Sequence, residues 1–149
     1  MMGEVHEAMI KIKQQMVYQQ DDPMEFTLNG TYEERDGRHR IAYTEFDMED
    51  AAETQVVLDF DDENIIIRKT GHINTVMTID CDGGTAEGVY QTPYGTFPMK
   101  IISKRYDCIE IRGLFILELE YRLLLSSRLV GDNRMKISAL VRRDYGHEH

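Results

Sequence analysis

The chain has no tryptophan, three prolines and two cysteines among its 149 residues. No apolar stretch approaches the ~20 residues of a membrane-spanning helix. The N-terminal segment lacks a basic region followed by an apolar core, so we expect no signal peptide. Cys81 and Cys108 are isolated and belong to no C-x-x-C pair. We therefore expect a cytoplasmic protein in which both thiols are free.

Catalytic and metal-binding motifs are also lacking. The four serines never occur as G-x-S-x-G. The glycine-rich segment 83–88 matches no phosphate-binding loop and leads into a predicted strand. The histidines show no zinc spacing, and the acidic segment 59–64 lacks the glycine and the final acid of a calcium loop. We expect no enzyme, no catalytic residue, no cofactor and no bound metal.

Positive charge is scarce in the first part of the chain. Residues 1–63 hold 17 acidic and 5 basic side chains, whereas residues 64–149 hold 10 and 12, and the net charge is −10. Such a chain repels phosphate backbones, so we expect no nucleic-acid partner. The acidic half suits a basic protein partner instead.

What the sequence does contain is alternation of apolar and polar residues, interrupted by turn signals every 8–12 residues or so, which is typical of a β-sandwich or barrel. Residues 54–60 and 115–124 show the pattern most clearly. Further strands are expected over 85–92, 96–103 and 106–112. The expected turns lie at Asp36-Gly37, 61–64, 69–71, 80–84 and 131–133.

Segment 5–18 fits both a strand and a helical face, and we favour the strand because hairpin-linked segments follow it. No longer helical pattern occurs, so the sheet must be antiparallel. Some ten short strands exceed what one flat sheet usually tolerates. We therefore predict one domain over residues 1–149, all-β, forming a closed antiparallel β-barrel of about 8–10 strands. A β-sandwich is the alternative.

Short motifs along the chain support this fold. They run from Gly30-Thr31-Tyr32 and the segment 41–45, through Thr54, Arg68 with Gly71 and Tyr90-Gln91-Thr92 with Gly95, to Gly113 and the segment 119–121. In this order they resemble the YwiB-like bacterial family of unknown function over residues 9–143. The resemblance implies a lipocalin-like (calycin-like) β-barrel in the bacterial cytosol, and no activity. True lipocalins carry a Gly-x-Trp near the start of the barrel, which this chain lacks.

Several polar residues share the apolar faces of the predicted strands. Glu45 is in phase with Tyr43, and Arg68 is in phase with Ile66. An unpaired charge inside an apolar lumen costs several kcal/mol, so we expect Glu45 and Arg68 to pair directly or through Tyr43, Tyr90 or a water. The candidate ligand-binding residues in the barrel interior are Tyr43, Glu45, Thr54, Arg68, Tyr90 and Tyr121.

The predicted interior is bulky, with residues such as Phe60, Phe97, Met99 and Phe115, so we expect a largely filled barrel with a modest cavity at one mouth. The first hypothesis is a non-enzymatic barrel that binds a small amphipathic ligand. The alternative is a protein-interaction module with a filled barrel and an acidic docking surface, and an enzyme is third. A pocket of several hundred Å³ that contains Glu45 and Arg68 would favour the first hypothesis, and a filled interior with an exposed apolar patch would favour the second.

Overall fold

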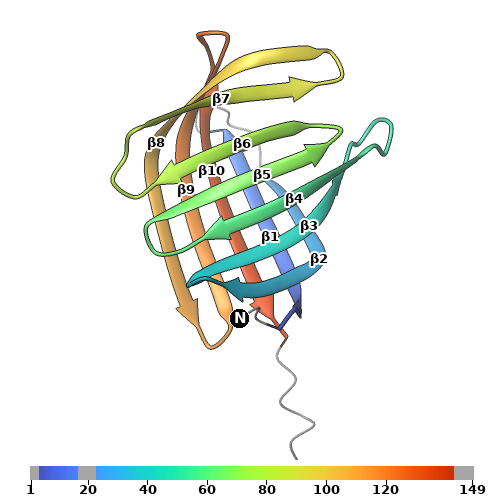
Figure 1. Cartoon of the computed structure of the whole chain (residues 1–149), viewed down its shortest axis with the longest axis vertical. Coiled ribbons are helices and arrows are strands. Elements are labelled where there is room, and N and C mark those ends of the chain that lie inside the picture. Colours follow the sequence, from blue (N-terminus) through green and yellow to red (C-terminus); the bar gives the residue numbers. More distant parts are fainter. Residues whose placement is uncertain (1–3, 17–22, 143–149) are drawn as a thin grey trace, which may run out of the picture.

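The computed structural model describes residues 4–16 and 23–142, and these form a closed antiparallel barrel (Figure 1). Each strand pairs with the next along the chain, and β1 pairs with β10 to close the ring. Because no open edge separates two sheets, the barrel prediction is confirmed and the β-sandwich alternative is wrong. The strands are β1 (His6–Met16), β2 (Met24–Arg35), β3 (Arg38–Phe46), β4 (Glu53–Phe60), β5 (Asn64–Gly71), β6 (Asn74–Asp80), β7 (Thr85–Thr92), β8 (Gly95–Ile111), β9 (Leu114–Leu125) and β10 (Arg128–Val141).

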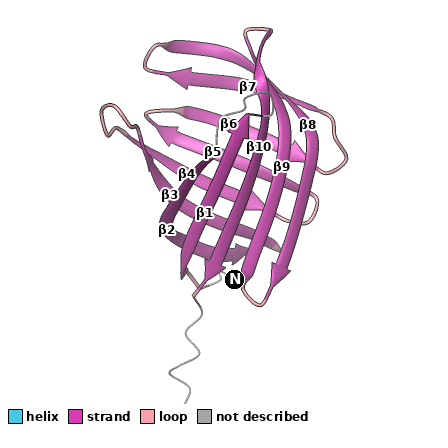
Figure 2. Ribbon diagram, turned by 180° about the vertical axis from the view of Figure 1, so that it is seen from behind, coloured by secondary structure: helices cyan, strands magenta, loops and turns pink. Residues whose placement is uncertain are grey.

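Two walls make up the barrel. Strands β1, β10, β9 and β8 run steeply and cross behind β2 to β6 in Figure 1, and the view from behind brings the steep wall to the front (Figure 2). In the described part of the chain, no helix is long and apolar enough to cross a membrane.

The ambiguous segment 5–18 forms β1 in its described portion, with residues 17 and 18 outside the described residues. Ala8, Ile10 and Ile12 are buried, and the residues between them are exposed. Ile10 lies between Leu28 of β2 and Ala139 of β10. Pairing on both edges satisfies the backbone hydrogen bonds of β1, and its period of two buries every second residue. A helix at this position would not bury alternate residues.

Gly30 of β2, within one of the motifs noted in the sequence, lies in close contact with both neighbouring strands. A Cβ at this position would collide with the carbonyl oxygen of Ala42 and with Ile10 Cδ1. The glycine therefore allows the backbone of β3 and the side chain of Ile10 to approach β2 closely where Gly30 pairs with Ala8 of β1.

Three expected strand boundaries are wrong. Residues 69–71 stay paired with β4, and the chain turns after them instead. Residues 131–133 lie within β10 beside a bulge, and the turn is formed by Ser126 and Ser127, whose φ angles are 52° and 65°. Serine is a weak signal for positive φ compared with Gly or Asn. The strands expected over 96–103 and 106–112 form the single strand β8, with an irregularity between Ser103 and Arg105.

One end of the barrel is filled by an aromatic plug, which we define as Tyr32, His39, Phe60 and Phe115. The ring centroid of Phe115 lies 5.3 Å from Tyr32, 4.7 Å from His39 and 5.5 Å from Phe60. The Tyr32 hydroxyl and His39 Nδ1 are 2.8 Å apart in a hydrogen bond. Both phenylalanines have zero exposure. These packed rings occupy the interior at this end of the barrel.

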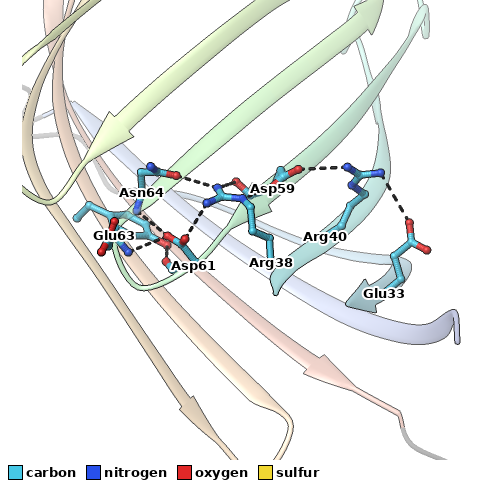
Figure 3. Close-up of polar contacts among 8 residues, drawn as sticks. Glu33, Arg38, Arg40, Asp59, Asp61, Glu63 and Asn64 are labelled. Atoms are coloured by element: carbon cyan, nitrogen blue, oxygen red, sulfur yellow. Dashed lines mark hydrogen bonds and ion pairs between the residues drawn. The ribbon is translucent and has the colours of Figure 1, made fainter. Parts of the chain in front are cut away.

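An ion network covers the outer face next to the plug (Figure 3). Arg38 donates to Asp59 through Nε at 2.5 Å, to Asp61 at 2.8 Å and to the Asn64 side chain at 2.7 Å. Arg40 donates to the other oxygen of Asp59 at 3.2 Å. Because these residues come from β3, β4, β5 and the turn between β4 and β5, the network ties the three strands together at the plugged end.

The ring is weakest between β6 and β7. Within the described residues these strands pair only at Asn74–Gln91 and Thr75–Tyr90, and the hairpin of β7 and β8 bends away from β6 in Figure 1. We expect peptides covering residues 76–89 to exchange their amide hydrogens faster than peptides covering β4 and β5, because fewer backbone pairs protect them. Hydrogen-exchange mass spectrometry measures this difference. Equal protection of the two sets of peptides would show that the pairing of β6 with β7 is as stable as the other strand pairings.

Candidate functional site

The end of the barrel opposite the plug contains a cavity of about 410 Å³. This volume lies in the range of small-molecule sites. Most of its wall is apolar, and four of its residues are methionines, whose flexible side chains adapt to irregular shapes. The cavity is lined by Ile12, Gln14, Met24, Phe26, Leu28, Tyr43, Glu45, Phe46, Met48, Leu58, Ile67, Lys69, Met77, Tyr121 and Met135.

A charged pair lies at the mouth of this cavity. Glu45 on β3 is opposite Thr54 of β4, and Lys69 on β5 is opposite Val56 of β4, so the two side chains approach each other across β4. The Lys69 Nζ lies 3.3 Å from Oε1 and 3.2 Å from Oε2 of Glu45. The side chains are 36% exposed for Glu45 and 24% for Lys69, so the pair contacts both water and the cavity.

The prediction that Arg68 enters the lumen is wrong. Arg68 is exposed on the outer face, and Lys69 occupies the inner position that pairs with Glu45. Residues 65–67 are three consecutive isoleucines, so periodicity could not assign the inner face of β5. The register decides it, because Ile67 lies opposite the buried Leu58 and carries Lys69 to the inside.

The two tyrosines predicted for the interior, Tyr43 and Tyr121, do line the cavity, at 8% and 5% exposure. Neither hydroxyl has a hydrogen-bond partner among the described residues. Burial, with a smaller contribution from Glu45, raises the pKa of Tyr43, and burial together with Tyr90 raises the pKa of Tyr121 to about 12. Both phenols are therefore protonated at neutral pH and able to donate a hydrogen bond into the cavity.

The remaining predicted residues lie close by but do not line the cavity. Thr54 is buried, and its hydroxyl accepts a hydrogen bond from the Ile73 amide at 3.1 Å, so it holds the turn between β5 and β6. Tyr90 on β7 is half-buried, and burial followed by the charge of Glu45 raises its pKa. Tyr90 packs against the buried core without lining the cavity.

Sequence reasoning missed several lining residues. Met77 and Met135 are in phase with the buried Ile79 and Ile137, so alternation could have found them. Phe46 is out of phase with Glu45 and reaches the cavity only because β3 ends there, which alternation does not reveal.

A second hollow of similar volume lies on the outer face of β1, β8, β9 and β10. Four of its six charged residues already pair with each other, because Arg134 Nε lies 2.7 Å from Glu120 and Arg105 Nη2 lies 2.9 Å from Glu118. This hollow is an exposed, salt-bridged strand surface, so the inner cavity is the better candidate site.

Two small groups of potential metal ligands lie at turns, outside the cavity. In one, Asp47 Oδ1 accepts hydrogen bonds from the backbone amides of Glu49 and Asp50, and His72 Nε2 lies 3.7 Å from Asp47 Oδ2. In the other, Asp80 accepts the Asp82 amide beside Cys81. These carboxylates cap their own loops, which accounts for their position without an ion.

Neither thiol is activated as a nucleophile. Cys81 and Cys108 are both free. Desolvation and the neighbouring Asp82 and Asp80 raise the pKa of Cys81, and burial raises the pKa of Cys108. The protonated thiol is a poor nucleophile and a poor metal ligand.

Fold and site together define a closed ten-stranded antiparallel β-barrel that is plugged at one end and has an amphipathic cavity at the other. The chain belongs to the family described as a domain of unknown function (DUF1934), whose model matches residues 10–137. The crystal structure of the ywiB protein from Bacillus subtilis is similar, with a TM-score of 0.79 and 13% sequence identity over 95% of this chain and 96% of that chain. This likeness shows the fold, and the YwiB-like resemblance is confirmed. No curated protein matches the chain.

Proposed function

We propose that this protein is a non-enzymatic carrier or sensor that binds one small amphipathic molecule in the mouth cavity. The observation that supports the proposal is an apolar cavity of about 410 Å³ into which two buried phenol groups, Tyr43 and Tyr121, present hydroxyls without protein partners. Among the described side chains, only Arg40 Nε is both fully enclosed and without a partner, so the two hydroxyls are open to the cavity and accessible to a ligand. A ligand with a polar head and an apolar body would satisfy the hydroxyls and cover the apolar wall.

The cavity chemistry favours binding over catalysis. Its described lining contains no serine, cysteine or histidine, and its one carboxylate is held by Lys69. Antiparallel barrels of similar size, such as lipocalins, hold a single small ligand in this way. The free thiols suit a reducing compartment, so the proposal places the protein in the bacterial cytosol.

Filling the cavity is expected to abolish ligand binding. Leu28 on β2 lines the cavity and is half-buried, so Leu28→Trp places an indole in the space that a ligand would occupy. We expect this variant to bind the uncharged dye Nile red at least about tenfold more weakly than the wild type, a change of about 1.4 kcal/mol. Fluorescence titration measures the affinity.

Thr27→Trp is the matched control, because Thr27 is the exposed neighbour of Leu28 on the same strand. We expect its affinity for the dye to stay within about twofold of the wild type. Circular dichroism confirms that both variants keep the barrel. Equal dye affinities for Leu28→Trp and the wild type would contradict binding in the cavity.

A further inference from the structure

The only cation that lines the cavity in the described chain is already neutralised. Lys69 is hydrogen-bonded to both carboxylate oxygens of Glu45. An anionic ligand that paired with Lys69 would displace Glu45 and then lie beside an unpaired carboxylate. Like charges at such a distance oppose binding, most strongly where water is excluded.

A cationic head group meets one like charge at the same place, Lys69, whereas the other polar and aromatic lining groups favour a cation. It can take the position of the Lys69 ammonium on Glu45, because Lys69 has a flexible stem and is 24% exposed, so that its own charge can move into water. The phenol oxygens of Tyr43 and Tyr121 are free to accept hydrogen bonds. The rings of Phe26 and Phe46 also line the cavity and can present faces that attract a cation.

The charges at the rim of the cavity also favour a cation over an anion. The segment 46–53, which joins β3 to β4 and supplies Phe46 and Met48 to the cavity, contains Asp47, Glu49, Asp50 and Glu53 and no lysine or arginine. The whole chain has a net charge of −10. Such a field concentrates cations at the mouth and repels anions.

Building on the proposed function, we propose that the cavity selects organic cations, with Glu45 as the residue that recognises the charge. The ligand class is a molecule with an apolar body and one protonated amine or quaternary ammonium group. The apolar body lies deeper in the cavity against Leu58, Ile67 and Met77, and the cationic head remains at the mouth.

Three amphiphiles of equal chain length test the selection: n-octylamine, octan-1-ol and octanoate. Isothermal titration calorimetry at neutral pH compares their affinities for the full chain. We expect n-octylamine to bind at least about tenfold more tightly than octan-1-ol, and octanoate to bind most weakly.

Three variants test whether Glu45 is the residue that recognises the charge of the ligand. Glu45→Gln should bring the affinities for n-octylamine and octan-1-ol to within about twofold of each other, whereas Lys69→Met should keep or increase the affinity for n-octylamine. Both residues are partly exposed at the mouth, so we expect both variants to fold. Glu87→Gln is the matched control, because Glu87 belongs to an exposed pair with Lys100 on the outer face, 3.8 Å apart, and this variant should behave as the wild type.

The outcomes separate this inference from the proposed function. If octanoate binds most tightly and loses its affinity in Lys69→Met, or if all three amphiphiles bind equally, the cation selection is wrong and the carrier function stands. If n-octylamine binds Leu28→Trp as tightly as the wild type, it binds charges on the surface and not the cavity, and the proposed selection of cations by the cavity is again wrong. If none of the three amphiphiles binds the wild type and Nile red does not bind either, the proposed function itself fails.

Discussion

Replacing Phe115 by alanine is expected to lower the free energy of unfolding by about 3–5 kcal/mol. Phe115 has zero exposure and lies at the centre of the aromatic plug, in contact with Tyr32, His39 and Phe60. Its removal leaves a cavity that rings fixed on rigid strands cannot refill. Urea unfolding followed by circular dichroism measures the loss.

Phe46→Ala is the control for this prediction. Phe46 is 60% exposed at the cavity mouth, so its removal should cost less than about 1 kcal/mol. Phe115→Ala also separates the effect on stability from the effect on ligand binding. Under conditions in which this variant is folded, it should bind Nile red as tightly as the wild type does, because the plug lies at the other end of the barrel from the cavity. Equal stabilities for the two variants would show that the plug does not hold the barrel together.

Replacing Asp59 by asparagine is expected to cost about 2 kcal/mol of stability. The carboxylate accepts hydrogen bonds from Arg38 and Arg40 and is 13% exposed, so its neutralisation removes the counter-ion that the two guanidinium groups share. Asp61 remains paired with Arg38 at 2.8 Å, and Glu33 with Arg40 at 3.9 Å. Breaking a fully buried pair costs about 3–5 kcal/mol. The loss here should be smaller, because Arg38 and Arg40 keep 27% and 32% exposure and remain partly hydrated.

The stability of the wild type should also depend on pH in the acid range. Burial alone would raise the pKa of Asp59, but the hydrogen bonds and charges of Arg38 and Arg40 outweigh it, so the pKa is lowered. The pKa of Asp61 is lowered as well, because the effect of burial is outweighed by hydrogen bonds from the amides of Glu63 and Asn64 and by the charge of Arg38. A lowered pKa stabilises the fold above the unfolded-state value of about 3.9. This stabilisation is lost as the pH falls through the folded-state pKa.

Urea unfolding between about pH 7 and pH 2 checks both statements. Asp59→Asn should be less stable at neutral pH and should show a shallower decline below about pH 4 than the wild type. Asp107→Asn is the control, because Asp107 and its partner Arg105 are each 51% exposed and such pairs contribute less than about 1 kcal/mol. An unchanged acid slope in Asp59→Asn would contradict the role of the network.

The amino-acid sequence by itself was sufficient for the class of fold and for much of the inner face. Alternation placed Tyr43, Leu58, Phe60, Phe115 and Tyr121 inside, and all five are buried. In these strands, single apolar residues alternate with polar ones, and the period of two then has one solution. The cavity residues Tyr43, Glu45 and Tyr121 were found in this way.

Only the tertiary structure decided the partner of Glu45, the position of the last turn and the end of the barrel that stays hollow. A run such as Ile65–Ile67 has no preferred face until Leu58 pairs with Ile67, and that pairing sends Arg68 outward and Lys69 inward. The turn at Ser126 and Ser127 follows from the pairing of β9 with β10, since these residues have little turn preference of their own. The plug forms where Tyr32, His39, Phe60 and Phe115 meet from four strands. Local periodicity specifies which residues share a face, whereas register and closure specify which faces meet.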